Sequence, residues 1–151
     1  MQTNLSVLVV DDDHVIRSLV RVVLARAGYT VATARDGVEA LEMLTGAHYD
    51  AVILDVMMPR LDGLGVVERL EQTAPAILDR TLLLTASNLR RLDELPVFGV
   101  MAKPFEMEEL LRQTQACIAN GRVENRETGM AMQMLSGRPS DLLFAFALGE
   151  R

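Results

Sequence analysis

The sequence has one cysteine, no tryptophan, four phenylalanines and two tyrosines. With Cys117 alone no internal disulfide can form, and sparse cysteine is typical of proteins of a reducing cytoplasm. No apolar run approaches the roughly 20 residues that a membrane span needs. Nor does a charged segment followed by a hydrophobic stretch mark a signal peptide at the N-terminus. We therefore predict a cytoplasmic protein that does not insert into membranes.

Positive charge is also scarce. The sequence has 15 lysines and arginines against 21 aspartates and glutamates, which gives a formal net charge of −6. Binding to nucleic acid needs clustered Lys and Arg against the phosphates, so the composition predicts no direct nucleic-acid contact. Hydrophobic residues make up 50% of the 151 positions, enough for one core without cross-links. We predict one domain over residues 1–119, followed by a tail over residues 120–151.

Short apolar runs alternate along the chain with segments whose apolar residues repeat at helical spacing. The runs predict strands, and the segments between them predict helices, with strands at 5–10, 29–33, 51–54, 81–84 and 97–102 and helices at 15–24, 36–46, 64–70 and 105–118. This alternation predicts an α/β fold, a parallel sheet with helices on both faces. In such sheets ligands bind beyond the carboxyl ends of the strands, which is where the sequence has Asp11, Asp55, Thr85 and Lys103.

Three carboxylates, those of Asp11, Asp12 and Asp55, would meet at that edge of the sheet. At ~4 Å two like charges repel by about 4 kcal/mol when the effective dielectric constant is about 20, so such a cluster takes up protons or binds a cation. Its hard oxygen ligands suit Mg²⁺. A carboxylate can also attack phosphorus, a reaction that depends on charge neutralisation and in-line positioning. Lys103 would supply a fixed cation and Thr85 a hydroxyl donor.

Four blocks of sequence, in this order along the chain, resemble the signature blocks of response-regulator receiver domains, the signalling modules of two-component systems. The blocks are Val9–Asp13, Asp55–Pro59 with Asp62-Gly63, Leu84–Ala86 and Lys103–Phe105. The resemblance covers about residues 5–119. It implies a flavodoxin-like fold similar to that of chemotaxis receivers, in which a five-stranded parallel sheet has the order 2-1-3-4-5.

The resemblance also implies a role for each acidic residue. Asp55 corresponds to the residue that accepts a phosphoryl group from a phosphohistidine kinase or a phosphotransfer protein. Mg²⁺ would be held by Asp11, Asp12, Asp55 and the backbone carbonyl of Met57.

Further roles follow from the other two blocks. Thr85 would turn toward the phosphoryl group, Lys103 would pair with one of its oxygens, and the Lys103–Pro104 peptide would be cis. Such a domain is a phosphorylation-controlled switch that acts on a downstream protein. It is not an enzyme beyond catalysing its own phosphorylation and dephosphorylation.

Two departures from the family pattern concern the output of the signal. Val100 stands three residues before Lys103, where receivers usually carry an aromatic residue that moves with the threonine. The segment between Thr85 and Lys103 is also short, and Pro96 interrupts any helix in it. The fourth helix is therefore predicted to be shortened.

The tail is too short for a winged helix or a helix-turn-helix, so no DNA-binding output domain is predicted in it. It contains an apolar run, Leu142–Leu148, after the helix-start signal Pro139–Asp141. Left exposed, such a run would promote aggregation. We expect a short helix that packs near the fifth strand and the last helix, in the same chain or across a homodimer formed through the tail or last helix. Its contacts would come from Leu142, Leu143, Phe144 and Phe146.

Two other functions remain open at this point. Asp11, Asp13 and Val15 also fit the DxDx[TV] motif of haloacid-dehalogenase-type phosphatases, which would make Asp11 the nucleophile. The Asp55 block would then have no explanation. A degenerate receiver that acts as a scaffold is the other alternative, and Val100 favours it.

Overall fold

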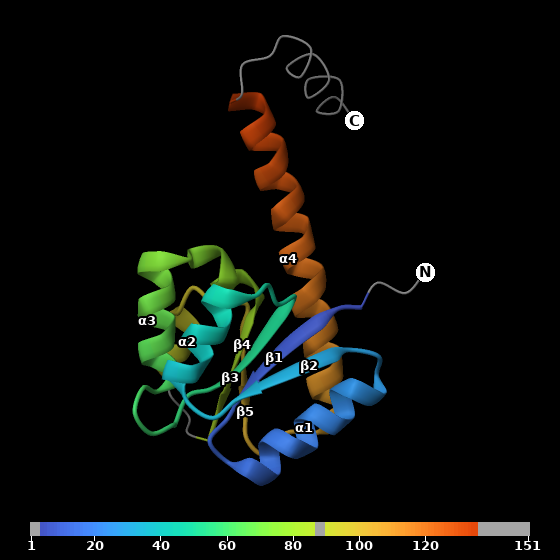
Figure 1. The fold of residues 1–151 in the computed structure, drawn as a ribbon, viewed down its shortest axis with the longest axis vertical. Helices are drawn as coiled ribbons and strands as arrows, with labels where there is room; N and C mark the ends of the chain where they lie inside the picture. The colour runs from blue at the N-terminus through green and yellow to red at the C-terminus, as the bar shows by residue number, and fades with distance from the viewer. Residues whose placement is uncertain (1–3, 87–89, 136–151) are drawn as a thin grey trace.

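The computed structural model describes residues 4–86 and 90–135, with side chains placed at 4–86 and 92–122. Within these residues, five parallel strands form one sheet in the order β2-β1-β3-β4-β5 (Figure 1). The strands are β1 (Ser6–Val10), β2 (Thr30–Ala34), β3 (Ala51–Asp55), β4 (Thr81–Thr85) and β5 (Gly99–Ala102). The predicted flavodoxin-like fold and its strand order are thus confirmed.

Helices cover both faces of this sheet, so the molecule has three layers (Figure 1). Helices α1 and α4 pack on one face, and α2 and α3 pack on the other together with two 3₁₀ helices, η1 and η2. The helices are α1 (His14–Arg26), α2 (Gly37–Gly46), α3 (Gly63–Thr73), η1 (Pro75–Arg80), η2 (Arg90–Glu94) and α4 (Met107–Leu135). Among the described residues, no helix has the length and apolar character needed to cross a membrane.

The central strand β1 shows why the strands are continuous apolar runs. Val7 and Val9 pack into the core beneath α1 and α4, whereas Leu8 and Val10 pack into the core beneath α2 and α3. All four side chains are at most 1% exposed. A pleated strand between two helical layers buries both of its faces, so it needs apolar residues at every position.

The register of the sheet brings the predicted site residues to one edge. Asp55, the last residue of β3, pairs with Leu84 of β4, one residue before Thr85. Asp11 and Lys103 directly follow β1 and β5. Since the strands are parallel, their carboxyl ends lie on the same side of the molecule, as the sequence predicted.

Aspartate side chains start three of the helices close to this edge. Asp13, Asp36 and Asp62 each accept a hydrogen bond from a backbone N–H of the first turn, of Val15 (2.9 Å), Glu39 (2.9 Å) and Gly65 (2.8 Å) respectively. Such caps satisfy backbone groups that have no partner inside the helix.

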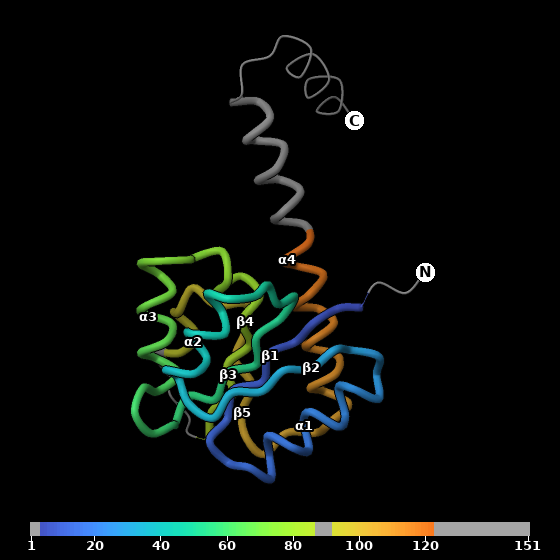
Figure 2. Tube along the Cα trace, in the orientation of Figure 1, coloured from blue at the N-terminus to red at the C-terminus, as the bar shows by residue number. Residues whose placement is uncertain are grey.

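The last helix is longer than the sequence suggested. It begins at Met107 instead of Phe105, and it continues to Leu135 instead of ending at Ile118. Figure 1 shows α4 running along the sheet and then projecting beyond the end where the strands begin, and Figure 2 follows the first part of α4 along the sheet as a tube. The predicted end of this helix was therefore wrong.

Contacts with η1 explain why the helix does not stop at the Asn120-Gly121 pair. The Asn120 side chain donates to the Asp79 carbonyl oxygen at 2.9 Å. A Cβ built on Gly121 would lie only 3.4 Å from the Cβ of Arg80, so this glycine allows close packing at a place where it resembles a helix end. Tertiary contacts here outweigh the low helix propensity of both residues.

The fifth strand starts later than predicted, at Gly99 and not at Val97. The backbone N–H of Phe98 donates to the carbonyl oxygens of Leu78 and Thr81, at 3.1 and 3.0 Å, and so connects the residue before the strand to η1 and β4. Between β4 and β5 the described residues form only η2, a five-residue 3₁₀ helix, in agreement with a shortened fourth helix. The tail beyond Leu135, including Leu142–Leu148, lies outside the described residues.

Candidate functional site

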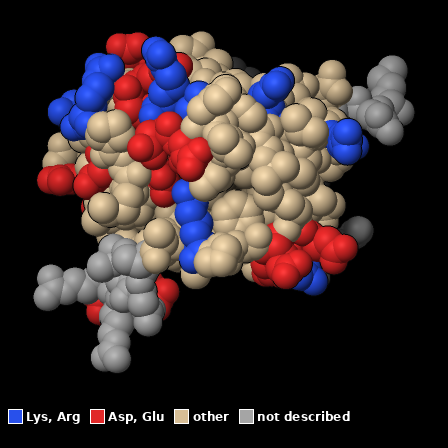
Figure 3. Space-filling model, turned by 90° about the horizontal axis from the view of Figure 1, so that it is seen from below, with Lys and Arg blue, Asp and Glu red and all other residues tan. Residues whose placement is uncertain are grey.

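Three carboxylates meet at the carboxyl edge of the sheet. Ligand oxygens of Asp11, Asp12 and Asp55 all lie within 4.8 Å of one another. Asp11 and Asp55 are 1% and 4% exposed, whereas Asp12 is open to solvent. Figure 3 looks onto this end of the molecule, where acidic side chains gather near the middle of the face beside a basic side chain. The predicted acidic cluster is thus brought together.

The main chain after β1 positions Asp11. Its backbone N–H donates to the Ala34 carbonyl oxygen at 3.2 Å, which extends the β1–β2 pairing by one residue. Its Oδ1 accepts from the backbone N–H of Asp13 at 2.9 Å, and Arg17 donates to its carbonyl oxygen at 2.8 Å. Arg17 was not predicted from the sequence, although its place one helical turn into α1 directs it back toward the end of β1.

Lys103 lies between two of the carboxylates. Its Nζ is 2.8 Å from Asp11 Oδ2 and 3.3 Å from Asp55 Oδ1, and its backbone N–H donates to the Thr85 carbonyl oxygen at 2.7 Å. Burial alone would lower the pKa of Lys103, but the hydrogen bond to Asp11 and the two negative charges raise it above its ordinary value. The lysine is therefore a fixed cation. The peptide to Pro104 is cis, as the resemblance implied.

The acidity of Asp55 reflects its crowded surroundings. Burial, and next the negative charge of Asp11, raise its pKa to about 6, while Lys103 and the backbone N–H of Met57 act in the opposite direction. A carboxyl group held in this state exchanges its proton readily for a metal cation. The donor set consists of hard carboxylate oxygens, with Asp12 open to water, which fits the coordination that Mg²⁺ prefers.

The loop after β3 is packed tightly against the end of that strand. The backbone N–H of Gly63 donates to the Val56 carbonyl oxygen at 2.8 Å and closes the loop. Within it, Met57 directs its backbone N–H to the Asp55 carboxylate and exposes its side chain, which is 63% accessible. The backbone of Met57 therefore lies at the site, which is where the resemblance placed a metal ligand.

Thr85 and Val100 stand on neighbouring strands. The Thr85 side chain is buried at the end of β4, in the strand next to Asp55. Val100 is partly buried and packs against the core beneath α2 and α3. An aliphatic side chain thus occupies the position where the family usually has an aromatic ring.

An apolar cavity of about 380 Å³ adjoins the site on the side of α1. It lies between the start of α1 and the β5–α4 connection and is lined by Ile16, Leu19, Ala86, Lys103, Pro104, Phe105 and Met107. Among the lining residues Leu19 is 49% exposed, and Val15 on the same helix is 72% exposed. Lys103 thus connects the acidic cluster to an exposed apolar surface.

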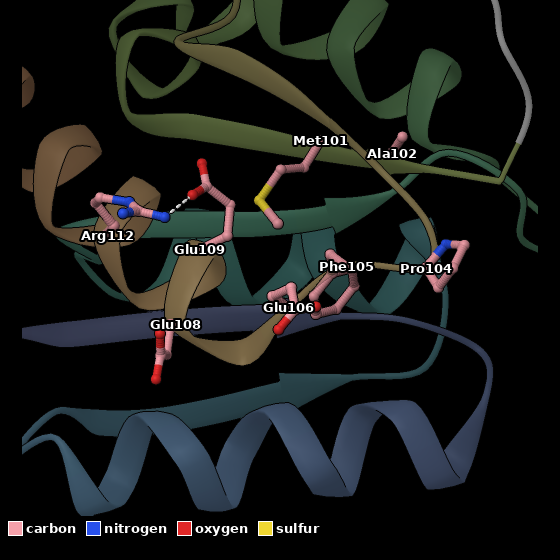
Figure 4. Close-up of a pocket in the computed structure, with 8 residues that line it drawn as sticks. All are labelled: Met101, Ala102, Pro104, Phe105, Glu106, Glu108, Glu109 and Arg112. Carbon is pink, nitrogen blue, oxygen red and sulfur yellow. Dashed lines mark hydrogen bonds and ion pairs between the residues drawn. The ribbon is translucent and has the colours of Figure 1, made fainter.

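A second cavity, of about 410 Å³, lies at the outer edge of β5 (Figure 4). Met101 and Phe105 contribute apolar surface, and glutamates from the first turn of α4 surround it, with Glu109 paired to Arg112. This is the face, near the fifth strand and the last helix, where the sequence predicted that the tail packs.

Known proteins with similar sequences and structures have this fold. The family model for the response regulator receiver domain matches residues 7–115. The chain therefore belongs to the response-regulator receiver family of two-component signalling. Response regulators work with sensor histidine kinases or phosphotransfer proteins.

Individual relatives support the same assignment. The chain is 41% identical over 130 residues to response regulator MprA of Mycobacterium ulcerans and 40% identical over 129 residues to MprA of Mycobacterium tuberculosis. These alignments cover 85% and 84% of this chain but only 56% of each relative. The chain thus spans about half the length of the curated relatives that it matches.

Solved structures match along nearly their whole length. The chemotaxis response regulator CheY4 of Vibrio cholerae is 34% identical with a TM-score of 0.69, and the match covers 76% of this chain and 99% of that one. Response regulator TrrA of Thermotoga maritima, in complex with Mg²⁺ and BeF, is 33% identical with a TM-score of 0.68, over 75% of this chain and 98% of that one.

Proposed function

We propose that the protein is a phosphorylation-controlled switch in which Asp55 accepts a phosphoryl group from a phosphohistidine kinase or a phosphotransfer protein. Mg²⁺ is held by Asp11, Asp12, Asp55 and the Met57 backbone carbonyl. The observation that carries this proposal is the placement of Lys103 Nζ between Asp11 and Asp55, inside a group of three carboxylates. A buried nucleophile, a cation and a metal-ligand set then occupy one edge.

The chemistry needs little beyond positioning and charge neutralisation. An oxygen of the Asp55 carboxylate forms the new bond to phosphorus, while the bond from phosphorus to the donor's imidazole nitrogen breaks and that nitrogen keeps the electron pair. Lys103 neutralises charge on a phosphoryl oxygen, and Thr85 offers a hydroxyl from the adjacent strand end. Mg²⁺, when bound, neutralises further phosphoryl charge.

Hydrogen bonding favours Asp55 over Asp11 as the nucleophile. Oδ1 of Asp11 accepts from the Asp13 backbone at 2.9 Å, and its Oδ2 accepts from Lys103 at 2.8 Å. Both oxygens of Asp11 are thus engaged, and the residue is 1% exposed. An attacking role for Asp11, as in the phosphatase alternative, would compete with both of these contacts.

The exposed apolar surface on α1 suits the docking of the phosphoryl donor. Leu19 lines the cavity that leads to Lys103, and Val15 is exposed on the same helix. Exposed apolar surface of this kind marks sites of protein interaction. A donor bound there would present its phosphohistidine next to Asp55.

The test is Mg²⁺-dependent labelling by a small acyl-phosphate donor. Wild type should acquire an acid-stable, base-labile phosphoryl group, and Asp55→Asn should not. Asp93→Asn, which changes an exposed carboxylate on η2, is the matched control and should be labelled like wild type. Labelling of Asp11 in the Asp55→Asn variant would support the phosphatase alternative. A lack of labelling in wild type would support the scaffold.

A further inference from the structure

The loop that follows Asp55 is attached to the start of α2 at two points. Arg60 Nη1 lies 3.2 Å from Asp36 Oδ2, and the backbone N–H of Gly37 donates to the Leu61 carbonyl oxygen at 3.1 Å. The two segments are more than twenty residues apart in the sequence, since the Arg60–Asp36 pair is separated by 24 positions. These contacts join the acceptor loop to a helix that contributes no side chain to the acidic cluster.

Asp36 is well suited to hold such a contact. Asp36 is only 7% exposed, and its two carboxylate oxygens have different partners. Oδ1 accepts from the Glu39 backbone N–H at 2.9 Å and caps α2, while Oδ2 faces Arg60. Removing the arginine would leave a buried carboxylate oxygen without its cation, and charge-assisted contacts of this kind are stronger than neutral ones.

The backbone at the contact has little freedom to move. A Cβ built on Gly37 would stand 2.4 Å from the Leu61 carbonyl oxygen, so the loop and the helix are in direct main-chain contact. Arg60 has a φ of 68°, a left-handed conformation that costs an L-residue other than glycine about 1–2 kcal/mol. The ion pair with Asp36 is an interaction that offsets this cost.

The other end of the same loop touches the acceptor. Met57 directs its backbone N–H to the Asp55 carboxylate, and its carbonyl is the proposed fourth metal ligand. The loop from Val56 to Asp62 is therefore attached to Asp55 at its start and to α2 near its end. Displacement of Arg60 would be transmitted to Met57 through only two intervening residues.

We propose that Arg60 and Asp36 are positioning residues for the metal and acceptor site, because they hold the loop in the shape that directs Met57 toward Asp55. This inference rests on the proposed function. Coupling between two sites is reciprocal. Mg²⁺ binding at the acidic cluster therefore stabilises the first turn of α2, in which Asp36 caps the Glu39 N–H.

The test compares three variants by calorimetric titration with Mg²⁺ alone. Arg60→Asn keeps a residue that tolerates the left-handed conformation but removes the cation, and it should weaken Mg²⁺ binding by about tenfold. Arg60→Lys restores a cation and should recover most of the affinity. Arg35→Ala is the matched control, because Arg35 forms an ion pair of the same 3.2 Å length with Glu39 on α2 but no hydrogen bond or ion pair with the described residues of the loop.

A second measurement separates positioning from simple destabilisation. Mg²⁺ should slow hydrogen exchange at the Glu39 amide in wild type and in Arg60→Lys, but not in Arg60→Asn. Mg²⁺ affinity in Arg60→Asn equal to that of wild type would overturn the inference and leave the proposed function intact. Absence of Mg²⁺ binding in wild type itself would overturn both.

Discussion

Gly63 lies so close to the main chain of Asp55 that a Cβ built on it would stand 2.4 Å from the Asp55 carbonyl oxygen and 2.8 Å from the Cα of Val56. Both neighbours are backbone atoms, which cannot rotate away as a side chain can. The first residue of α3 is thus in close contact with the end of β3, and a side chain at this position would force the loop and the strand apart.

Gly63→Ala should therefore reduce both stability and metal binding. Steric overlap in a closely packed region costs about 1–3 kcal/mol, or more where only backbone can give way. Gly46→Ala is the control, since a Cβ at Gly46 meets nothing within 4 Å. Chemical denaturation should show a clear loss for the first variant and no loss for the second. If Gly63→Ala and Gly46→Ala have equal free energies of unfolding, the close packing of Gly63 against the Asp55 backbone is wrong.

Removal of the Asp12 carboxylate should weaken metal binding more than it affects the stability of the fold. It is the exposed member of the acidic cluster, so its removal should disturb the fold least. We expect Asp12→Ala to weaken Mg²⁺ binding by at least tenfold, which is roughly 1.4 kcal/mol or more.

Asp13→Asn removes the charge of the neighbouring residue but keeps a good helix cap. Its effect on Mg²⁺ affinity should therefore be much smaller than that of Asp12→Ala. If the two variants bind Mg²⁺ equally well, the assignment of Asp12 as a ligand is wrong.

Without metal, Asp55 should destabilise the fold as the pH rises. Its pKa is about 6 in the folded state against 3.8 ordinarily, so the folded state binds the proton more tightly. This contribution to stability is complete below pH 4 and is lost as the pH rises through about 6. In a chelator, the unfolding free energy of wild type should fall relative to Asp55→Asn between these pH values.

With saturating Mg²⁺ the comparison should reverse at neutral pH. Metal binding to the folded state favours the ionised carboxylate and stabilises wild type by mass action. If wild type is as stable as Asp55→Asn at every pH, with and without Mg²⁺, the idea that the Asp55 carboxylate is destabilised by its surroundings is wrong.

The sequence predicted the elements whose signals are local. The apolar runs gave the strands, and the residues that follow them gave Asp11, Asp55, Thr85 and Lys103 at one edge. The grouping of these residues could be predicted because residues that follow different parallel strands lie at the same edge of the sheet.

Contacts between distant segments were not predictable in this way. No local pattern pairs Arg60 with Asp36, and the left-handed conformation of Arg60 is one that arginine seldom adopts. The end of α4 was misplaced for a similar reason. Gly121 resembles a helix end, but its lack of a side chain serves packing against Arg80.

The final prediction concerns the tail. Its apolar run, Leu142–Leu148, needs a surface that shields it from water. The cavity of about 410 Å³ at the β5 edge provides apolar surface from Met101 and Phe105, next to the first turn of α4. Burial of one large apolar side chain contributes about 1.5–3 kcal/mol, so several together would offset the entropy lost on ordering a short segment.

Deleting residues 136–151, or replacing the four large side chains Leu142, Leu143, Phe144 and Phe146 by glutamine, should lower the melting temperature or change the oligomeric state. The replacement variant keeps the chain length, so it separates loss of apolar contacts from loss of the segment. Phosphorylation would then act by shifting the population of the docked tail, a change in a two-state equilibrium. Melting and sedimentation that match wild type in both variants, together with rapid amide exchange throughout the tail, would show that the tail does not dock.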